Sequence, residues 1–576
     1  MPTSTSRRIL GSPATAVALL SAIGMALRLT GLSDKPFWSA ELQEVFNARC
    51  AAFLKNLPDS GSDVLGFLWH NLVWRLDLTP LELWDRLPSA LLGVLFVPLC
   101  YAWGAELHGR RAGLVAAVMA CCSVLLVDLS QAARFYGTAA LAGNAATLAL
   151  LKALRAGRSD WKALLPFWAA DAAALLSHGL SVTFLLVQGL VVLYVLSLER
   201  RMTPAAVVRQ GLRIFLPVAP PLLLEVLVVL GFRAKMMGHQ TAFLVGRPYG
   251  VAALVESVAV GLSGGFGPLW VVFGGLVGVG LIALWYHRRT SLVASGASLA
   301  VPLVVLAAFA ATVSGNAFDM TFVSFLCPAA YAAAGAAVAS MSVAIGNRKV
   351  AAAACVTLLA LFVASNAWML HAYYRSPVKP VLGADFRSVS RMLASANPGK
   401  DDILLYRYDE YFTHMAFYSA YELQLPQLVA EVVPPHSRGV LFEYLHRLNG
   451  CSDRPRVTPD RVRDLADMEA SRSTARGRLF VVLSCPLGFG DSSVETEAGA
   501  IHRALPDFAT WVQEAGVLRS TCDPVAARLS GFTLVQFPGV VVAWKDVQGR
   551  RVADVAAEMR AVFAALPAQR LRLQPR

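Results

Sequence analysis

The stretch DRLPSALLGVLFVPLCYAW, residues 85–103, decides the fold class of this chain. Its first two residues are charged, and the seventeen that follow carry no charge. A helix needs about 20 mostly apolar residues to cross the hydrocarbon core of a bilayer. The whole chain has the same character, since 56% of its 576 residues are hydrophobic and 15% are charged. Soluble domains carry about 25% charged residues. The sequence therefore predicts an integral membrane protein.

Working outward from this stretch, we expect about eleven membrane-spanning helices. The first apolar segment follows Arg7 and Arg8, as in a signal peptide, but no clean small-x-small cleavage site follows, so it is interpreted as a retained anchor. A further apolar stretch, 251–262, could form an interfacial or re-entrant helix. The predicted spans lie near 9–29, 87–105, 112–127, 135–151, 163–177, 179–197, 214–232, 265–286, 291–312, 321–345 and 350–370.

Lysine and arginine are unevenly distributed over the short loops between these spans. Cytoplasmic loops of membrane proteins are enriched in these residues. A cytoplasmic N-terminus puts most of them on the inner side, including the pairs at 7–8, 110–111, 200–201, 288–289 and 348–349. With eleven spans, the part of the chain after the last span lies outside, in a periplasm-like space.

Three regions follow from this topology. Residues 1–370 form the membrane domain, and its first outer loop, 30–86, is long and aromatic. Residues 375–576 are predicted to form a soluble α/β domain, because apolar strand-like runs alternate with helical periodicity. The expected strands are DILLY (402–406), RLFVVLSC (478–485), FTLVQF (532–537) and VVVAW (540–544), and the expected helices lie near 385–396, 459–470, 500–515 and 552–566.

The cysteines and basic residues limit the remaining classes of function. Five of the nine cysteines fall in spans, where cysteine usually packs as a small hydrophobe: Cys100, Cys121, Cys122, Cys327 and Cys355. The other four lie outside, where one or two disulfides with an open pairing are expected: Cys50, Cys451, Cys485 and Cys522. No CxxC or HExxH pattern is present, so the need for a divalent metal stays open. No basic stripe interleaved with aromatics argues for nucleic-acid binding.

Polar residues gather at the outer ends of the predicted spans, where charge is costly and often functional. A carboxylate there could act as a general base, and arginines could hold a phosphate group. This combination suits a lipid-phosphate substrate. The candidate catalytic residues are Glu41 and Glu44, and the candidate phosphate- or substrate-binding residues are Gln131, Arg134, Tyr136, His178, Arg233, Lys235 and Arg247.

Each candidate also has a purely structural interpretation. Arg134 could extend to the interface along its aliphatic stem, and Tyr136 could belong to an interfacial aromatic belt. His178 could be a packing histidine, and Glu44 a solvated loop carboxylate. The basic residues between 233 and 247 could contact lipid headgroups without any catalytic role.

The order of motifs resembles the bacterial membrane glycosyltransferases of the GT-C superfamily, in the branch of protein mannosyltransferases, aminoarabinose transferases and lipopolysaccharide-core galacturonic acid transferases. The resemblance rests on FWSAEL (37–42), DRLPS (85–89), HGRRAG (108–113), SQAARFYG (130–137) and His178, and it fades after about residue 195. It implies a polyprenyl-phosphate sugar donor, inverting transfer, and an envelope glycolipid, polysaccharide or protein as acceptor. It also implies the bacterial inner membrane as location.

The chain departs from the pattern of that family at three places. Ala40 stands where the family has the aspartate of an Asp-Glu pair, which implies that Glu41 keeps the second acidic position. Ala132 replaces a frequent glutamate, and Val323 and Ser324 stand where an Arg-Tyr pair is expected. The alternatives are therefore an active transferase that uses Glu41, with help from Glu44 or Asp128, or a scaffold that binds lipid phosphate without transferring sugar. A transporter ranks last, because no matched pair of interrupted spans is visible.

Overall fold

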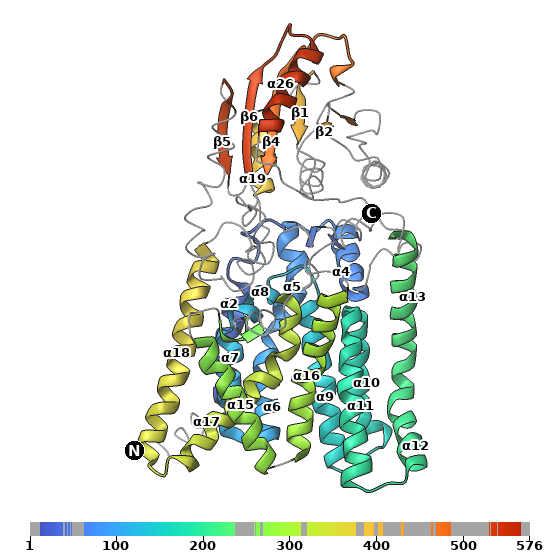
Figure 1. Ribbon diagram of the computed structural model, residues 1–576, viewed down its shortest axis with the longest axis vertical. Coiled ribbons are helices and arrows are strands. Elements are labelled where there is room, and N and C mark those ends of the chain that lie inside the picture. Colours follow the sequence, from blue (N-terminus) through green and yellow to red (C-terminus); the bar gives the residue numbers. More distant parts are fainter. Residues whose placement is uncertain are drawn as a thin grey trace.

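The structure is a computed structural model of the chain. It describes residues 12–37, 41–42, 44–45, 48, 63–236, 258–259, 261–264, 269–287, 289–312, 320–375, 385–396, 401–406, 428–430, 462–464, 468–484, 529, 531–537 and 540–565. Within these residues the protein is a bundle of helices with a small sheet at one end (Figure 1).

The bundle contains the long apolar helices of the first 375 residues. Short 3₁₀ or π segments interrupt several of them. The elements are α2 (Pro13–Leu29), α4 (Val64–Arg75), α5 (Leu81–Val94), α6 (Phe96–His108), α7 (Arg110–Cys122), α8 (Val124–Ser130), α9 (Tyr136–Arg155), α10 (Trp161–Ser177), η2 (Gly179–Ser181), α11 (Val182–Leu193), η3 (Tyr194–Glu199), α12 (Pro204–Phe215), η4 (Leu216–Val218), α13 (Ala219–Met236), α15 (Leu269–His287), α16 (Arg289–Thr312), η6 (Met320–Leu326), α17 (Cys327–Ala344) and α18 (Arg348–Arg375).

All eleven stretches predicted to span a membrane coincide with helices in this structure. Seven helices in the described part of the chain are long and apolar enough to cross a membrane, or eight if the bent pair α7–α8 counts as one span. The multi-pass helical membrane fold is therefore confirmed. The count of eleven and the orientation of the termini stay predictions. Most of the stretch 251–262 lies outside the described residues.

Helix α17 is the centre of the bundle because its side chains are small. Its residues from Cys327 to Ala337 are buried, and most of them are alanine. An added Cβ at Gly335 would lie 2.4 Å from the carbonyl oxygen of Ala112 on α7. Small residues let membrane helices approach backbone to backbone, which takes the place of a hydrophobic driving force within lipid.

A break between α7 and α8 shapes the end of the bundle that faces the sheet (Figure 1). The two helices are bent by 57°, and Ser123 at the break accepts from the backbone N–H of Leu126. The Tyr331 hydroxyl donates to Ser123 Oγ at 2.9 Å, and Asn366 Oδ1 accepts from the N–H of Val124 at 3.0 Å. The polar groups of Ser123 and Val124 at the break therefore have hydrogen-bond partners on α17 and α18. The short helix α8 that follows leads into the loop 131–135.

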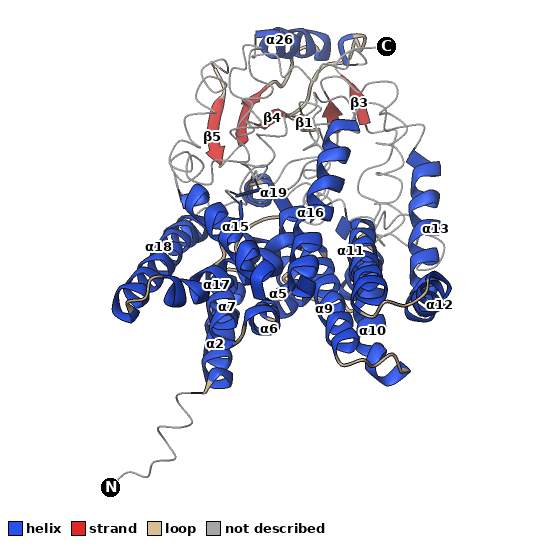
Figure 2. Ribbon diagram, turned by 60° about the horizontal axis from the view of Figure 1, so that its bottom comes forward, coloured by secondary structure: helices blue, strands red, loops and turns tan. Residues whose placement is uncertain are grey.

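The last part of the chain forms a six-stranded mixed sheet in the order β3-β2-β1-β4-β6-β5. Strand β1 pairs in parallel with β2 and β4, β2 pairs in parallel with β3, and β6 is antiparallel to β4 and β5. Figure 2 shows α26 on one side of the sheet and α19 between the sheet and the bundle. The elements are α19 (Phe386–Ser395), β1 (Ile403–Tyr406), β2 (Leu428–Ala430), β3 (Val462–Asp464), β4 (Arg478–Ser484), β5 (Thr533–Phe537), β6 (Val540–Asp546) and α26 (Val552–Ala565).

The α/β character predicted for the tail is confirmed. All four predicted strands are present, and the predicted helices at 385–396 and 552–566 correspond to α19 and α26. The helix expected near 459–470 is wrong in part, because residues 462–464 extend the sheet beside β2. The region 500–515 and the four outer cysteines lie outside the described residues, whereas the five cysteines in spans have free thiols. The division into two domains at about residue 370 stays a prediction.

Candidate functional site

The predicted motif SQAARFYG forms the loop that joins α8 to α9, and it is held from several directions. Gln131 Nε2 donates to the backbone carbonyl oxygens of Arg28 and Thr30 at 3.1 and 2.7 Å. The Tyr373 hydroxyl, on α18, donates to Gln131 Oε1 at 3.0 Å. Gln131 therefore ties the ends of α2 and α18 to this loop, which favours a structural role over the predicted contact with substrate.

Glu41 lies in a fully buried ion pair with Arg86, the arginine of DRLPS. Arg86 Nε and Nη2 donate to the two carboxylate oxygens of Glu41 at 3.0 and 2.7 Å, and both side chains are at most 1% exposed. The backbone N–H of Ala133 donates to Glu41 Oε1 at 2.6 Å. Both oxygens of Glu41 are thus occupied. This geometry favours an anchoring role for Glu41 over the general-base role expected from the sequence.

Arg86 also fixes the chain that leads to Glu41. Its Nη1 donates to the carbonyl oxygens of Leu32 and Lys35 at 3.1 and 2.8 Å, and its Nη2 donates to that of Pro36 at 3.1 Å. A guanidinium presents five N–H donors in a rigid fork, so one arginine can hold a carboxylate and several carbonyls together. The first outer loop is therefore organised around this side chain.

A buried histidine, His70, holds the loop between α8 and α9 at Ala133. His70 Nε2 lies 3.1 Å from the carbonyl oxygen of Ala133, and His70 Nδ1 lies 2.9 Å from Asp85 Oδ1, with both side chains fully buried. A carbonyl oxygen only accepts, so Nε2 carries a proton. The contact between Nδ1 and the carboxyl of Asp85 fixes the orientation of the ring.

We expect Asp85→Ala to lower the free energy of unfolding by about 1–3 kcal/mol, because it leaves the buried Nδ1 of His70 without this partner. Asp85→Asn should cost much less, because its side-chain amide can donate to Nδ1 of a neutral imidazole. The thermal unfolding midpoint of the detergent-solubilised protein measures both variants. Equal midpoints for the two would contradict this role of the Asp85 carboxyl.

Arg134, Glu44, Tyr136 and His178 form a second polar cluster at the same end of the bundle. Arg134 Nε donates to Glu44 Oε2 at 2.6 Å, and the guanidinium carbon lies 4.5 Å from the ring centroid of Tyr136. The rings of Tyr136 and His178 lie 4.8 Å apart. The Arg134 side chain is 23% exposed, whereas that of Glu44 is 5% exposed. Four predicted site residues are therefore together, and the cation is the accessible one.

Burial and charge set the protonation states in this cluster. Burial and the neighbouring Arg134 lower the pKa of His178 to about 3, so this imidazole is neutral at physiological pH. The N–H of Leu180 donates to His178 Nδ1 at 3.1 Å, which places the proton of the neutral ring on Nε2. Tyr136 and Glu44 hold the pKa of Arg134 high despite its burial, so the guanidinium stays charged.

Asp63 also belongs to the cluster, although no pattern in the sequence points to it. It precedes α4 and accepts from the N–H groups of Gly66 and Phe135 at 2.7 and 3.0 Å. Its carboxyl is 3% exposed and lies beside that of Glu44. Burial, followed by the charge of Glu44, raises the pKa of Asp63 well above its usual range. Sequence reasoning did not select three residues that these contacts bring into the site: Asp63, Asp85 and Arg86.

The remaining predicted site residues are not placed in either cluster. Arg233 and Lys235 lie in the last turns of α13, and their side chains are outside the description. Ala40 and Arg247 lie outside the described residues. Among the described residues, no group of three His, Cys, Asp or Glu side chains could hold a metal ion. Whether the protein uses a divalent metal therefore stays open.

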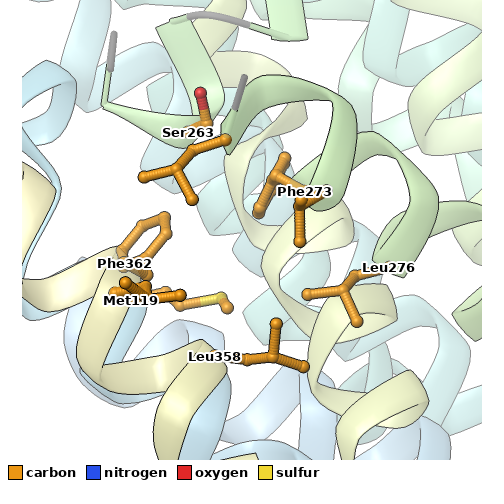
Figure 3. Close-up of a pocket in the computed structure, with 9 residues that line it drawn as sticks. Met119, Ser263, Phe273, Leu276, Leu358 and Phe362 are labelled. Carbon is orange, nitrogen blue, oxygen red and sulfur yellow. The ribbon is translucent and has the colours of Figure 1, made fainter. Parts of the chain in front are cut away.

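An apolar pocket lies between α7, α15 and α18, apart from the polar clusters. Figure 3 shows Met119, Phe273, Leu276, Leu358 and Phe362 around it, with the hydroxyl of Ser263 at its edge. None of its lining residues is charged. The pocket therefore offers apolar packing and no group for acid–base or phosphate chemistry.

No protein-family model matches the sequence, and no curated protein sequence matches it significantly. Several solved structures are similar to the chain, among them two of one enzyme and one of another. Apo ArnT from Cupriavidus metallidurans has 13% identity and a TM-score of 0.53, and the match covers 92% of this chain and 98% of ArnT. The same enzyme bound to undecaprenyl phosphate has 14% identity and a TM-score of 0.49, with 92% and 97% covered. The oligosaccharyltransferase AglB from Archaeoglobus fulgidus, in complex with an inhibitory peptide and a dolichol-phosphate, has 10% identity and a TM-score of 0.48, with 93% and 74% covered. The likeness to apo ArnT establishes the fold.

Proposed function

We propose that this chain, which has the GT-C fold, moves a sugar from a polyprenyl-phosphate donor to an acceptor on the outer face of the bacterial inner membrane. The observation that carries the proposal is the state of Arg134. Glu44 occupies its Nε, and its two terminal nitrogens have no hydrogen-bond partner among the described residues. A charged, oriented and partly exposed guanidinium fits the bidentate recognition of a phosphate.

The reaction would need from this chain a positive charge at the donor's phosphate and a base for the acceptor's proton. The donor's phosphate must be held as the bond from the sugar's anomeric carbon to the phosphate oxygen breaks, since that oxygen keeps the electron pair. Arg134 would supply the positive charge that stabilises this leaving group. The acceptor's nucleophilic group would attack the anomeric carbon from the opposite face, with inversion, and would lose its proton to a base. Tyr136, held against the guanidinium, would keep Arg134 in place.

Two observations support this proposal beyond Arg134. The fold is shared with ArnT, and that enzyme has been solved with undecaprenyl phosphate bound. The cluster also contains the neutral imidazole of His178, whose ring lies against that of Tyr136 beside the guanidinium.

A second candidate is a scaffold that binds lipid phosphate and transfers nothing. It is favoured by the sequence FWSAEL, in which Ala40 occupies the position of the expected aspartate. It is also favoured by the ion pair that occupies both oxygens of Glu41. This candidate shares Arg134 and its phosphate ligand with the first, so the two differ only in turnover.

The test is sugar transfer by the purified protein in proteoliposomes, from a panel of radiolabelled polyprenyl-phosphate sugars to envelope glycolipid, polysaccharide and protein fractions. We expect the wild type to transfer one sugar, and Glu41→Gln to reduce the amount of folded protein more than the turnover of the folded fraction. Donor retained without transfer, together with transfer by Ala40→Asp, would establish the binding scaffold instead. A wild type that neither binds nor transfers any donor in the panel would contradict both candidates.

A further inference from the structure

Glu44 and Asp63 lie side by side, and the hydrogen bonds among the described residues leave one buried oxygen of Glu44 without a donor. Glu44 Oε2 accepts from Arg134 Nε, whereas Glu44 Oε1 is buried and has no donor in the described part of the chain. Both oxygens of Asp63 already accept from backbone N–H groups, those of Gly66 and Phe135. Two ionised carboxylates in contact would repel each other without any donor between them.

A protonated Asp63 satisfies every one of these atoms. Its hydroxyl oxygen can accept from one backbone N–H while donating its own proton to Glu44 Oε1. Its other oxygen accepts from the second N–H. Glu44 then has a donor for each of its oxygens, Asp63 for one and Arg134 for the other. Burial and the charge of Glu44, which raise the pKa of Asp63, act in the same direction.

We propose that Asp63 and Glu44 share one proton, and that this pair is the positioning device that keeps Arg134 available for the donor phosphate. With the proton present, the three groups sum to a charge of zero, and the terminal nitrogens of Arg134 can accept an anion. Without it, the sum is one negative charge beside the phosphate site. This inference rests on the proposed function for its ligand, but the shared proton itself does not.

Other titratable groups around the pair have to be separated from it. Among the described residues these are Arg134 itself, Tyr136 on α9 and His178 after α10. Arg134 stays charged and His178 stays neutral throughout the physiological range. The phosphate of the ligand loses its second proton at a pH of about 6, so it is fully ionised above pH 8. A change of affinity above pH 8 therefore reports the carboxyl pair, with Tyr136→Phe as the check on the phenol.

Glu44→Gln is the decisive variant, because it removes the shared proton and keeps the hydrogen bonds. The Gln side-chain oxygen can accept from Arg134 Nε, and its amide can donate to an ionised Asp63. We expect the infrared spectrum of the wild type at neutral pH to contain a buried carboxylic C=O stretch that Glu44→Gln lacks. Arg75→Gln, at an exposed arginine on α4, should keep this band. A difference spectrum without the band would overturn the shared proton.

The consequence for binding is measured with undecaprenyl phosphate in nanodiscs. In the wild type, once the pair loses its proton, Kd should rise by up to about tenfold per pH unit, because binding is linked to one proton. In Glu44→Gln, Kd should change by less than about twofold over the same range, whatever its value at neutral pH. Equal slopes in both proteins would overturn the positioning role. A band without any binding of undecaprenyl phosphate would contradict the proposed function and leave the shared proton standing.

Discussion

Arg86→Met should lower the free energy of unfolding by about 3–5 kcal/mol, the largest loss of stability expected for a single substitution in this site. The variant leaves the carboxylate of Glu41 buried without its bidentate partner. It also leaves the carbonyl oxygens of Leu32, Lys35 and Pro36 without their shared donor. The loss is measured by heating the purified protein in detergent and determining by size-exclusion chromatography the fraction that stays folded at each temperature.

Two further variants separate the charge of Arg86 from its geometry. Arg86→Lys keeps the positive charge but cannot reach two carboxylate oxygens and three carbonyls together, so we expect an intermediate loss. Glu41→Gln removes the buried negative charge and keeps an acceptor for Arg86 and Ala133, so it should cost less than Arg86→Met. If Arg86→Met unfolds at the same temperature as the wild type, the ion pair does not organise the first outer loop.

The helices of this protein were predictable because the physics that forms them is local. A run such as 85–103 has to hide its backbone polar groups from lipid, and a helix does so within the segment. The strands of the tail were visible for a similar reason, as short apolar runs. Residues 462–464 were mistaken for part of a helix because their strand is specified by the neighbouring β2, which is distant in sequence.

The motifs were visible in the sequence, but the contacts between them were not. Arg86 was noted only as part of DRLPS, and nothing in its surroundings points to Glu41, which lies 45 positions earlier. The backbone N–H of Ala133 donates to Glu41, and its carbonyl oxygen accepts from His70. An alanine gives no signal in sequence for a backbone that is used in this way. The resemblance rests on these motifs, and in this structure three of them contact one another: FWSAEL, DRLPS and SQAARFYG.

Asp63 shows the limit of selecting residues by motif. It lies in a stretch with no pattern, and its importance comes from burial beside Glu44 and from two backbone donors. An acidic residue directly before the apolar helix α4 would be interpreted as an ordinary N-cap, and Asp63 is indeed that cap. Only the three-dimensional contact with Glu44 and Arg134 distinguishes it from other caps.

Arg134→Gln should lower kcat/KM for sugar transfer by about 10²–10³-fold, because in the proposed reaction it removes the charge that would stabilise the departing phosphate. The substitution keeps a donor for Glu44 and a side chain of similar length, so the fold should persist. Transfer from the donor identified in the panel, measured in proteoliposomes, gives the rate, and the Kd of undecaprenyl phosphate gives the binding component. If the affinity for undecaprenyl phosphate falls and kcat is unchanged, Arg134 stabilises the ground state and the transition state equally.

Three control variants make this result specific to Arg134. Arg75→Gln removes one exposed positive charge from α4 and should leave kcat/KM within about twofold of the wild type, because exposed charges are screened by salt. Arg134→Lys keeps the charge and loses the planar fork, so it should recover part of the rate. Tyr136→Phe keeps the ring under the guanidinium and should be tolerated best. An Arg134→Gln variant with wild-type transfer would place the donor phosphate elsewhere, and the cation that holds it would then have to come from a different part of the chain.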